Sequence, residues 1–185
     1  LKPANSLLMR GFSAKPRIPR MQERFGLNPV CIAHYPMYRG LAKFVGMNVL
    51  DAGNTPEDAF RVYLDNCSRY DFVFIHIKYT DSYGEDGNFK EKVKTIEAVD
   101  KALPILLEKK PTVLCITGDH STPTLFKGHS WHPVPVMIHS DYCGFDDAPR
   151  FTENNCNKGS LGMFESKYLM NYLLANAMKL SKFGA

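Results

Sequence analysis

An aspartate and two histidines follow a single run of apolar residues in this sequence. The run, 113–116, comes after a proline and contains no polar residue, which predicts a strand covered on both faces. Asp119 and His120 come shortly after it, and His129 follows nine residues after His120. Carboxylates and imidazoles that leave the end of a rigid strand together are groups that bind divalent metal ions. The segment therefore predicts the start of a metal site.

A second group of acidic side chains lies upstream, after another apolar strand pattern at 72–78. The polar stretch 80–87 that follows is expected to be a loop, and it contains Asp81 and Glu85. In open α/β sheets, ligands bind beyond the carboxyl ends of the parallel strands. We therefore expect the two groups of side chains to face one another across one crevice.

Each of these residues also has an ordinary structural interpretation when it is taken alone. Asp81 or Glu85 would then make a turn, and Asp119 would cap a helix. Four other histidines are expected to be hydrogen-bonded structural residues: His34, His76, His132 and His139. His132 is kept as a reserve ligand because it lies three residues from His129.

Taken together, the residues resemble those of the phosphoglycerate mutases that need no bisphosphoglycerate cofactor, and in particular their archaeal-type branch. The resemblance rests on Asp81 with Glu85, on the Asp119-His120 pair, and on His129 before Pro-Val-Pro. It extends from about Asn5 to the C-terminal helix and includes further matching stretches: Arg10-Gly11, 40–47 and 92–100. This family belongs to the alkaline phosphatase superfamily.

The resemblance implies an α/β fold, with a mostly parallel sheet flanked by helices and an alkaline-phosphatase-like core that is only partly present. It also implies two bound divalent metal ions, which serve phosphoryl transfer through a serine nucleophile. Asp81, Glu85 and His129 would hold one ion. Asp119 and His120 would help to hold the other.

The residue at position 85 departs from the family pattern, which has a histidine four residues after the aspartate, whereas this chain has Glu85. Exchanging imidazole for carboxylate favours hard cations. We therefore expect manganese or magnesium in preference to zinc.

The nucleophilic serine and one more aspartate ligand would come from the family's N-terminal portion, and this chain begins at Leu1. We interpret the chain as the C-terminal part of a longer protein, with the catalytic serine outside it. The chain alone is expected to show no mutase turnover.

Two regions are expected along the chain. Residues 1–25, of which 5–20 are rich in Pro, Lys and Arg, resemble the end of the substrate-binding domain that is inserted in this family, and 26–185 would form the metal-binding phosphatase-like α/β domain. Arg10 is a candidate clamp for a substrate phosphate or carboxylate, and Arg39 is a weaker one, because guanidinium offers paired donors to anionic oxygens. The alternative for both is an ordinary surface arginine.

Composition excludes several classes of protein. The chain has 185 residues, of which 44% are apolar, and a formal charge of +4 with its lysines and arginines scattered among acids, so neither disorder nor nucleic-acid binding is indicated. No apolar run is long enough to cross a bilayer. Five cysteines without a Cys-x-x-Cys pair favour reduced thiols and a cytoplasmic location.

Apolar periodicity predicts alternating strands and helices, as a parallel sheet with covering helices requires. Strands are expected at 30–33, 48–50, 72–78, 113–116 and 134–138. Helices are expected at 37–45, 59–67, 89–106 and 168–180, and an irregular segment at 141–162. Thr55-Pro56-Glu57, before the second of these helices, has the composition of a capped helix start.

The function expected from these features is a metal-dependent mutase that interconverts 2-phosphoglycerate and 3-phosphoglycerate in glycolysis through a phosphoserine intermediate. The alternatives are another phosphatase or phosphomutase of the alkaline phosphatase superfamily, or a fragment without catalysis. Phosphoglycerate is the expected partner, neither nucleic acid nor membrane is expected, and the oligomeric state stays open.

Overall fold

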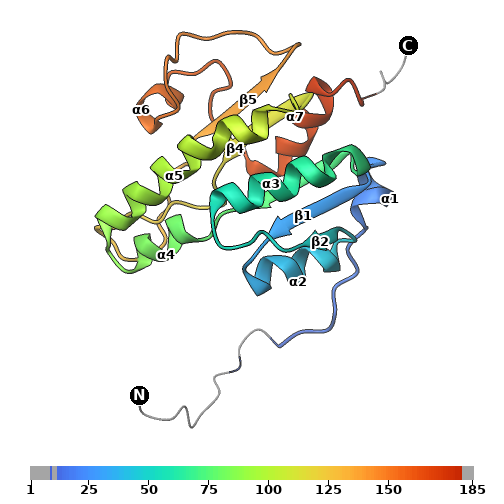
Figure 1. Ribbon diagram of the computed structural model, residues 1–185, viewed down its shortest axis with the longest axis horizontal. Helices are drawn as coiled ribbons and strands as arrows, with labels where there is room; N and C mark the ends of the chain where they lie inside the picture. The colour runs from blue at the N-terminus through green and yellow to red at the C-terminus, as the bar shows by residue number, and fades with distance from the viewer. Residues whose placement is uncertain (1–8, 10–11, 181–185) are drawn as a thin grey trace.

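A parallel sheet of three strands lies at the centre of the first part of the chain (Figure 1). The structure is a computed structural model and describes Met9 and residues 12–180. Strand β1 (Pro29–Ala33) pairs in parallel with β2 (Asn48–Leu50) on one side and with β3 (Phe72–His76) on the other. Every residue of β1 is buried, as its apolar composition requires.

Helices cover both faces of this sheet. Because successive strand residues point to opposite faces, Ile32 of β1 packs under α3 (Pro56–Asn66) and α5 (Phe89–Leu107). Cys31 and Ala33 face the other way and pack with Ala42 of α2 (Pro36–Phe44). The predicted fold class, a parallel sheet flanked by helices, is therefore confirmed.

Helix α3 begins where its sequence indicates. Thr55 is the N-cap, and its hydroxyl accepts a hydrogen bond from the Asp58 N–H at 3.1 Å. The Asp58 carboxylate accepts in turn from the Thr55 N–H at 3.0 Å, which completes a capping box. Pro56 occupies the first helical position, where a missing N–H costs nothing.

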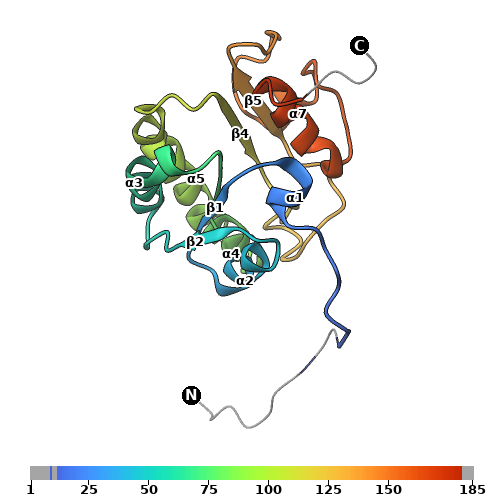
Figure 2. The same cartoon turned by 90° about the vertical axis from the view of Figure 1, so that its right-hand side faces the viewer.

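The remaining two strands form a separate antiparallel sheet, in which β4 (Val113–Thr117) pairs with β5 (Val136–Ser140). Figure 2 places this pair beside α7 (Leu169–Asn176), and the Ser140 hydroxyl donates to the Asn176 side chain at 2.8 Å. The expectation of one mostly parallel sheet therefore holds for β1 to β3 and fails for β4. The apolar run predicted the strand correctly, but it carries no information about which neighbour supplies the hydrogen bonds.

The expected loop at 80–87 is wrong, because Tyr79–Glu85 form helix α4. Gly84 of this helix is buried and α4 packs against α5, so tertiary contacts stabilise a helix that the polar sequence does not favour by itself. The segment expected to be irregular contains one short helix, α6 (Glu153–Cys156), which Thr152 caps.

Three short elements were not predicted from sequence: α1 (Met21–Phe25), a 3₁₀ turn at Cys67–Arg69 and another at Ser166–Tyr168. The Met21 N–H donates to the Val45 carbonyl at 2.9 Å, which joins α1 to the end of α2. No helix within the described ranges is long and apolar enough to cross a membrane.

All five cysteines are free thiols, as expected. Burial raises the pKa of the Cys31 thiol to about 11, and it does the same for Cys115. Both groups are therefore uncharged thiols at neutral pH, which makes them inert packing residues.

Replacing Thr55 by alanine removes the side-chain cap of α3, and we expect the free energy of unfolding to fall by about 1 kcal/mol. Thr55→Ser is the matched control, because it keeps the hydroxyl acceptor and should retain most of the stability. Urea denaturation of both variants measures the difference. Equal stability of the two variants would show that the cap contributes nothing.

Candidate metal centre

Three segments bring the candidate ligands together. Helix α4 carries Asp81 in its first turn and Glu85 at its end, four residues apart and so on one side of the helix. Asp119 and His120 follow the end of β4. His129 returns to the same place because its loop is closed by a bridge in which the Ser130 N–H donates to the Ser121 carbonyl at 2.9 Å.

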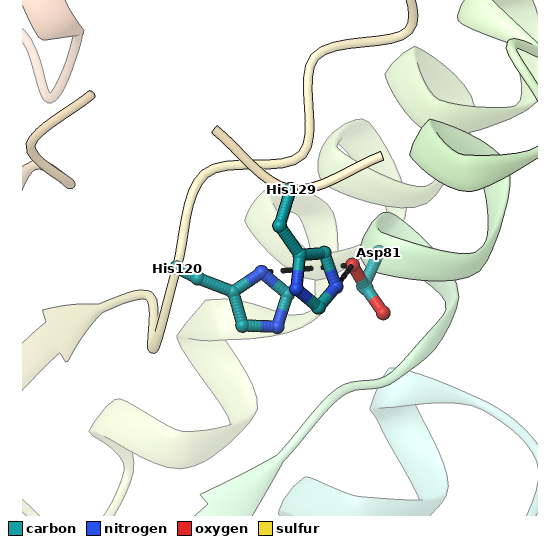
Figure 3. A group of neighbouring side chains, drawn as sticks. All are labelled: Asp81, His120 and His129. Carbon is teal, nitrogen blue, oxygen red and sulfur yellow. Dashed lines mark ion pairs between the residues drawn. The ribbon is translucent and has the colours of Figure 1, made fainter. Parts of the chain in front are cut away.

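The side chain of His129 meets both carboxylates of α4. Its Nε2 lies 3.6 Å from Asp81 Oδ1 and 3.7 Å from Glu85 Oε1. The His120 ring lies beside that of His129, with 3.7 Å between ring centroids, and its Nδ1 is 3.7 Å from the same Asp81 oxygen (Figure 3). One ligand atom from each of Asp81, His120 and His129 lies within 4.8 Å of the others.

Asp119 lies on the far side of the His120 ring. His120 Nε2 is 3.4 Å from Asp119 Oδ2, so this imidazole lies between two carboxylates, those of Asp81 and Asp119. The Tyr38 hydroxyl donates a hydrogen bond to the Asp119 carboxylate. The backbone N–H of His120 donates to Asp119 Oδ1 at 3.0 Å.

Lys78 carries a positive charge next to the carboxylates of α4. The Lys78 ammonium donates to Asp81 and lies 4.0 Å from Glu85 Oε2. The hydroxyl of Thr122 donates to Asp81 Oδ1 at 2.5 Å. Sequence reasoning placed Lys78 at the end of a strand and passed over Thr122, although the latter lies only two residues after His120.

These contacts keep the carboxylates ionised. Burial alone would raise the pKa of Asp81, but hydrogen bonds from Lys78 and Thr122 and the charge of Lys78 outweigh it, so the pKa lies below its usual value. Burial would also raise the pKa of Asp119, but the hydrogen bond from Tyr38 and the charge of His120 outweigh it, so this pKa is lowered as well. Both groups are acceptors at neutral pH.

The donor set fits a divalent cation. Neighbouring ligands of a cation with bonds of about 2.1 Å lie about 3.0 to 3.4 Å apart in octahedral or tetrahedral geometry. His129 Nε2 lies 3.6 Å from Asp81 Oδ1 and 3.7 Å from Glu85 Oε1, and His120 Nε2 lies 3.4 Å from Asp119 Oδ2. For these three pairs, small rotations of the side chains suffice.

Arg39, one of the two candidate substrate residues, is not part of this group. Arg39 forms an ion pair with Asp51, with 2.6 Å between Nη1 and Oδ2, and His34 Nδ1 is 3.5 Å from the same carboxylate. Arg10 lies outside the described residues. Binding of substrate by either arginine stays a prediction.

The reserve ligand His132 also lies apart from the group. Its Nδ1 is 2.9 Å from the Ser130 hydroxyl, and its ring stacks on Trp131 with 4.9 Å between centroids. His76 is stacked on Tyr38, with ring centroids 3.6 Å apart. Burial lowers the pKa of His76, so it is a neutral packing residue behind Tyr38.

Comparison with known proteins relates the chain to a described family and to named relatives. The family model described as the Metalloenzyme superfamily matches residues 3–176. A probable 2,3-bisphosphoglycerate-independent phosphoglycerate mutase of Aquifex aeolicus is 55% identical over 183 residues, which cover 98% of this chain and 45% of that protein. The chain thus spans less than half the length of the curated relatives that it matches.

Two solved structures share the fold. A protein of Pyrococcus horikoshii superposes with a TM-score of 0.91 at 30% identity, over 96% of this chain and 50% of that one. The cofactor-independent phosphoglycerate mutase of Thermoplasma acidophilum gives a TM-score of 0.69 at 27% identity, over 88% and 39% of the two chains. The family resemblance predicted from the sequence is confirmed.

Gly84 is expected to be intolerant of a side chain. A Cβ at this position would overlap the Thr122 carbonyl oxygen and lie 2.9 Å from Thr122 Cγ2. Gly84→Ala should therefore force α4 away from the loop and lower the free energy of unfolding by about 1 to 3 kcal/mol.

Gly40→Ala is the matched control, because Gly40 is also in a helix and a Cβ there meets nothing within 4 Å. It should raise stability by up to about 1 kcal/mol. Thermal unfolding of both variants tests the contrast, and equal shifts would contradict the close packing at Gly84.

Proposed function

Because the chain belongs to the Metalloenzyme superfamily, we propose that its protein is a metal-dependent phosphoglycerate mutase. It would interconvert 2-phosphoglycerate and 3-phosphoglycerate in glycolysis through a phosphoserine intermediate, with the serine outside this chain. The observation that carries the proposal is the convergence of Asp81, Glu85, His120 and His129, in a chain whose curated relatives are named as such mutases. The five free thiols support a cytoplasmic location.

We assign the ligands to two cation positions. Asp81, Glu85 and His129 would hold one divalent ion, since His129 Nε2 is within 3.7 Å of an oxygen of each carboxylate. Asp119 and His120 would help to hold the other, and the 3.4 Å between Oδ2 and Nε2 supports this pairing.

Divalent ions bound there would neutralise charge on a phosphoryl group and lower the pKa of a coordinated hydroxyl. The chain's own residues orient the ligands. Lys78 holds one oxygen of Asp81, which leaves the other oxygen turned to the imidazoles. Tyr38 holds Asp119 from the side of β3, where it stacks on His76.

Glu85 decides the choice of metal in this proposal. With Glu85, the first position offers two carboxylates and one imidazole, which suits manganese or magnesium better than zinc. Lys78, 4.0 Å from Glu85, partly balances the additional negative charge.

His129→Ala should lower the affinity for manganese by about tenfold or more, because losing a ligand costs at least as much as losing a group that supports one. His132→Ala is the control, since His132 lies in the same loop but outside the group. Isothermal titration with Mn²⁺ measures both variants. Similar manganese affinities of His129→Ala and His132→Ala would show that His129 is not a metal ligand.

Activity is tested on the whole protein that contains this chain, with 3-phosphoglycerate and manganese. We expect 2-phosphoglycerate to form and Asp119→Ala to lose at least about a hundredfold in rate, as expected when charge stabilisation is removed from a transition state. Release of free phosphate without isomerisation would instead identify a phosphatase of the same superfamily.

Glu85→His should shift the preference toward zinc. Imidazole is a better ligand for zinc than for magnesium or manganese, so the ratio of zinc to manganese affinities should rise by about tenfold. Glu97→His, on the exposed side of α5, adds a histidine away from the group and should leave the ratio unchanged. Competition between the two metals, followed by elemental analysis, measures the ratio.

A further inference from the structure

Thr122 is a buried polar residue in direct contact with two of the candidate ligands. Its side chain and backbone are 4% exposed. The hydroxyl oxygen lies 2.5 Å from Asp81 Oδ1 and 3.0 Å from His120 Nδ1. Thr122 therefore joins helix α4 to the segment after β4.

Counting hydrogens fixes the direction of both hydrogen bonds. A threonine hydroxyl has one hydrogen to donate and lone pairs to accept. The Asp81 carboxylate, which also accepts from Lys78, can only accept, so Thr122 donates to it. Thr122 must then accept from His120, and the hydrogen of the His120 ring lies on Nδ1.

This direction selects the nitrogen of His120 that is free to bind a cation. An imidazole that binds a cation is neutral, and when its hydrogen is on Nδ1 its lone pair is on Nε2. Nε2 is the atom 3.4 Å from Asp119, whereas Nδ1 is the atom 3.7 Å from Asp81. His120 is thus paired with Asp119, although its ring also lies close to Asp81 and His129.

Thr122 itself is held from both adjoining helices. The Lys92 ammonium of α5 donates to the Thr122 carbonyl at 2.7 Å. On α4, the absence of a side chain at Gly84 allows the Thr122 backbone and methyl group to approach closely. The hydroxyl therefore has one fixed position relative to α4.

We propose that Thr122 is a positioning residue that divides the ligands between the two cation positions, by fixing the hydrogen of His120 on Nδ1 and one oxygen of Asp81. The proposal rests on the proposed function. Thr122 acts through His120 and Asp81, without touching the cation. Removing only its hydroxyl should weaken metal binding while the fold is kept.

The test compares Thr122→Val, which replaces the hydroxyl by a methyl group, with Thr122→Ser, which keeps the hydroxyl. In the full chain without metal, nitrogen NMR of the His120 ring should show hydrogen on Nδ1 for the native protein and for Thr122→Ser. Thr122→Val should lose this single tautomer. Manganese affinity, measured by titration, should fall by about 10- to 100-fold in Thr122→Val and by much less in Thr122→Ser.

The two measurements separate this inference from the proposed function. Hydrogen on Nε2 alone, with the lone pair on Nδ1 of His120, would overturn the inference in the native chain, even if Thr122→Val does not fold. Equal manganese affinity of the native chain and folded Thr122→Val would also overturn it. If the whole protein that contains this chain binds no manganese, the proposed function fails. The His120 tautomer, compared between the native protein and Thr122→Ser, then decides whether Thr122 positions the ring.

Discussion

The structure depends on bringing the carboxylates of Asp81, Glu85 and Asp119 close to one another without leaving their charge unbalanced. Two like charges about 4 Å apart near a protein surface repel by about 4 kcal/mol, and the repulsion falls as the distance between them grows. The chain offsets this repulsion with Lys78, which contacts Asp81 and approaches Glu85, and with the hydroxyls of Tyr38 and Thr122. A divalent cation would complete the same balance, which is why the geometry and the proposed metal dependence agree.

The elements around the site are arranged to keep these groups in place. Helix α4 packs on α5 through a glycine, and Lys92 of α5 holds the loop that carries His120. The Ser121 to Ser130 bridge closes the loop and returns His129 to the carboxylates. The imidazoles are therefore held by hydrogen bonds of the backbone as well as by their own contacts, as preorganised ligands require.

The neighbours of position 85 bear on its departure from the family pattern. Glu85 in place of histidine adds a negative charge, and the Lys78 ammonium, 4.0 Å from Glu85 Oε2, partly balances that charge. Arg39, in contrast, is already paired with Asp51, so its guanidinium would have to exchange partners before it could bind an anionic substrate. The same residue types thus have different consequences according to their neighbours.

The sequence by itself determined the apolar strands, the start of α3 at Thr55 and the side chains available for chemistry. These follow from local patterns, since burial, capping and ligand type are properties of residues and their spacing. Only the tertiary structure decided that β4 pairs antiparallel with β5, that 79–85 form a helix, and that Thr122 and Lys78 reach Asp81. Hydrogen-bond partners from distant segments depend on packing in three dimensions, and no local pattern in the chain specifies them.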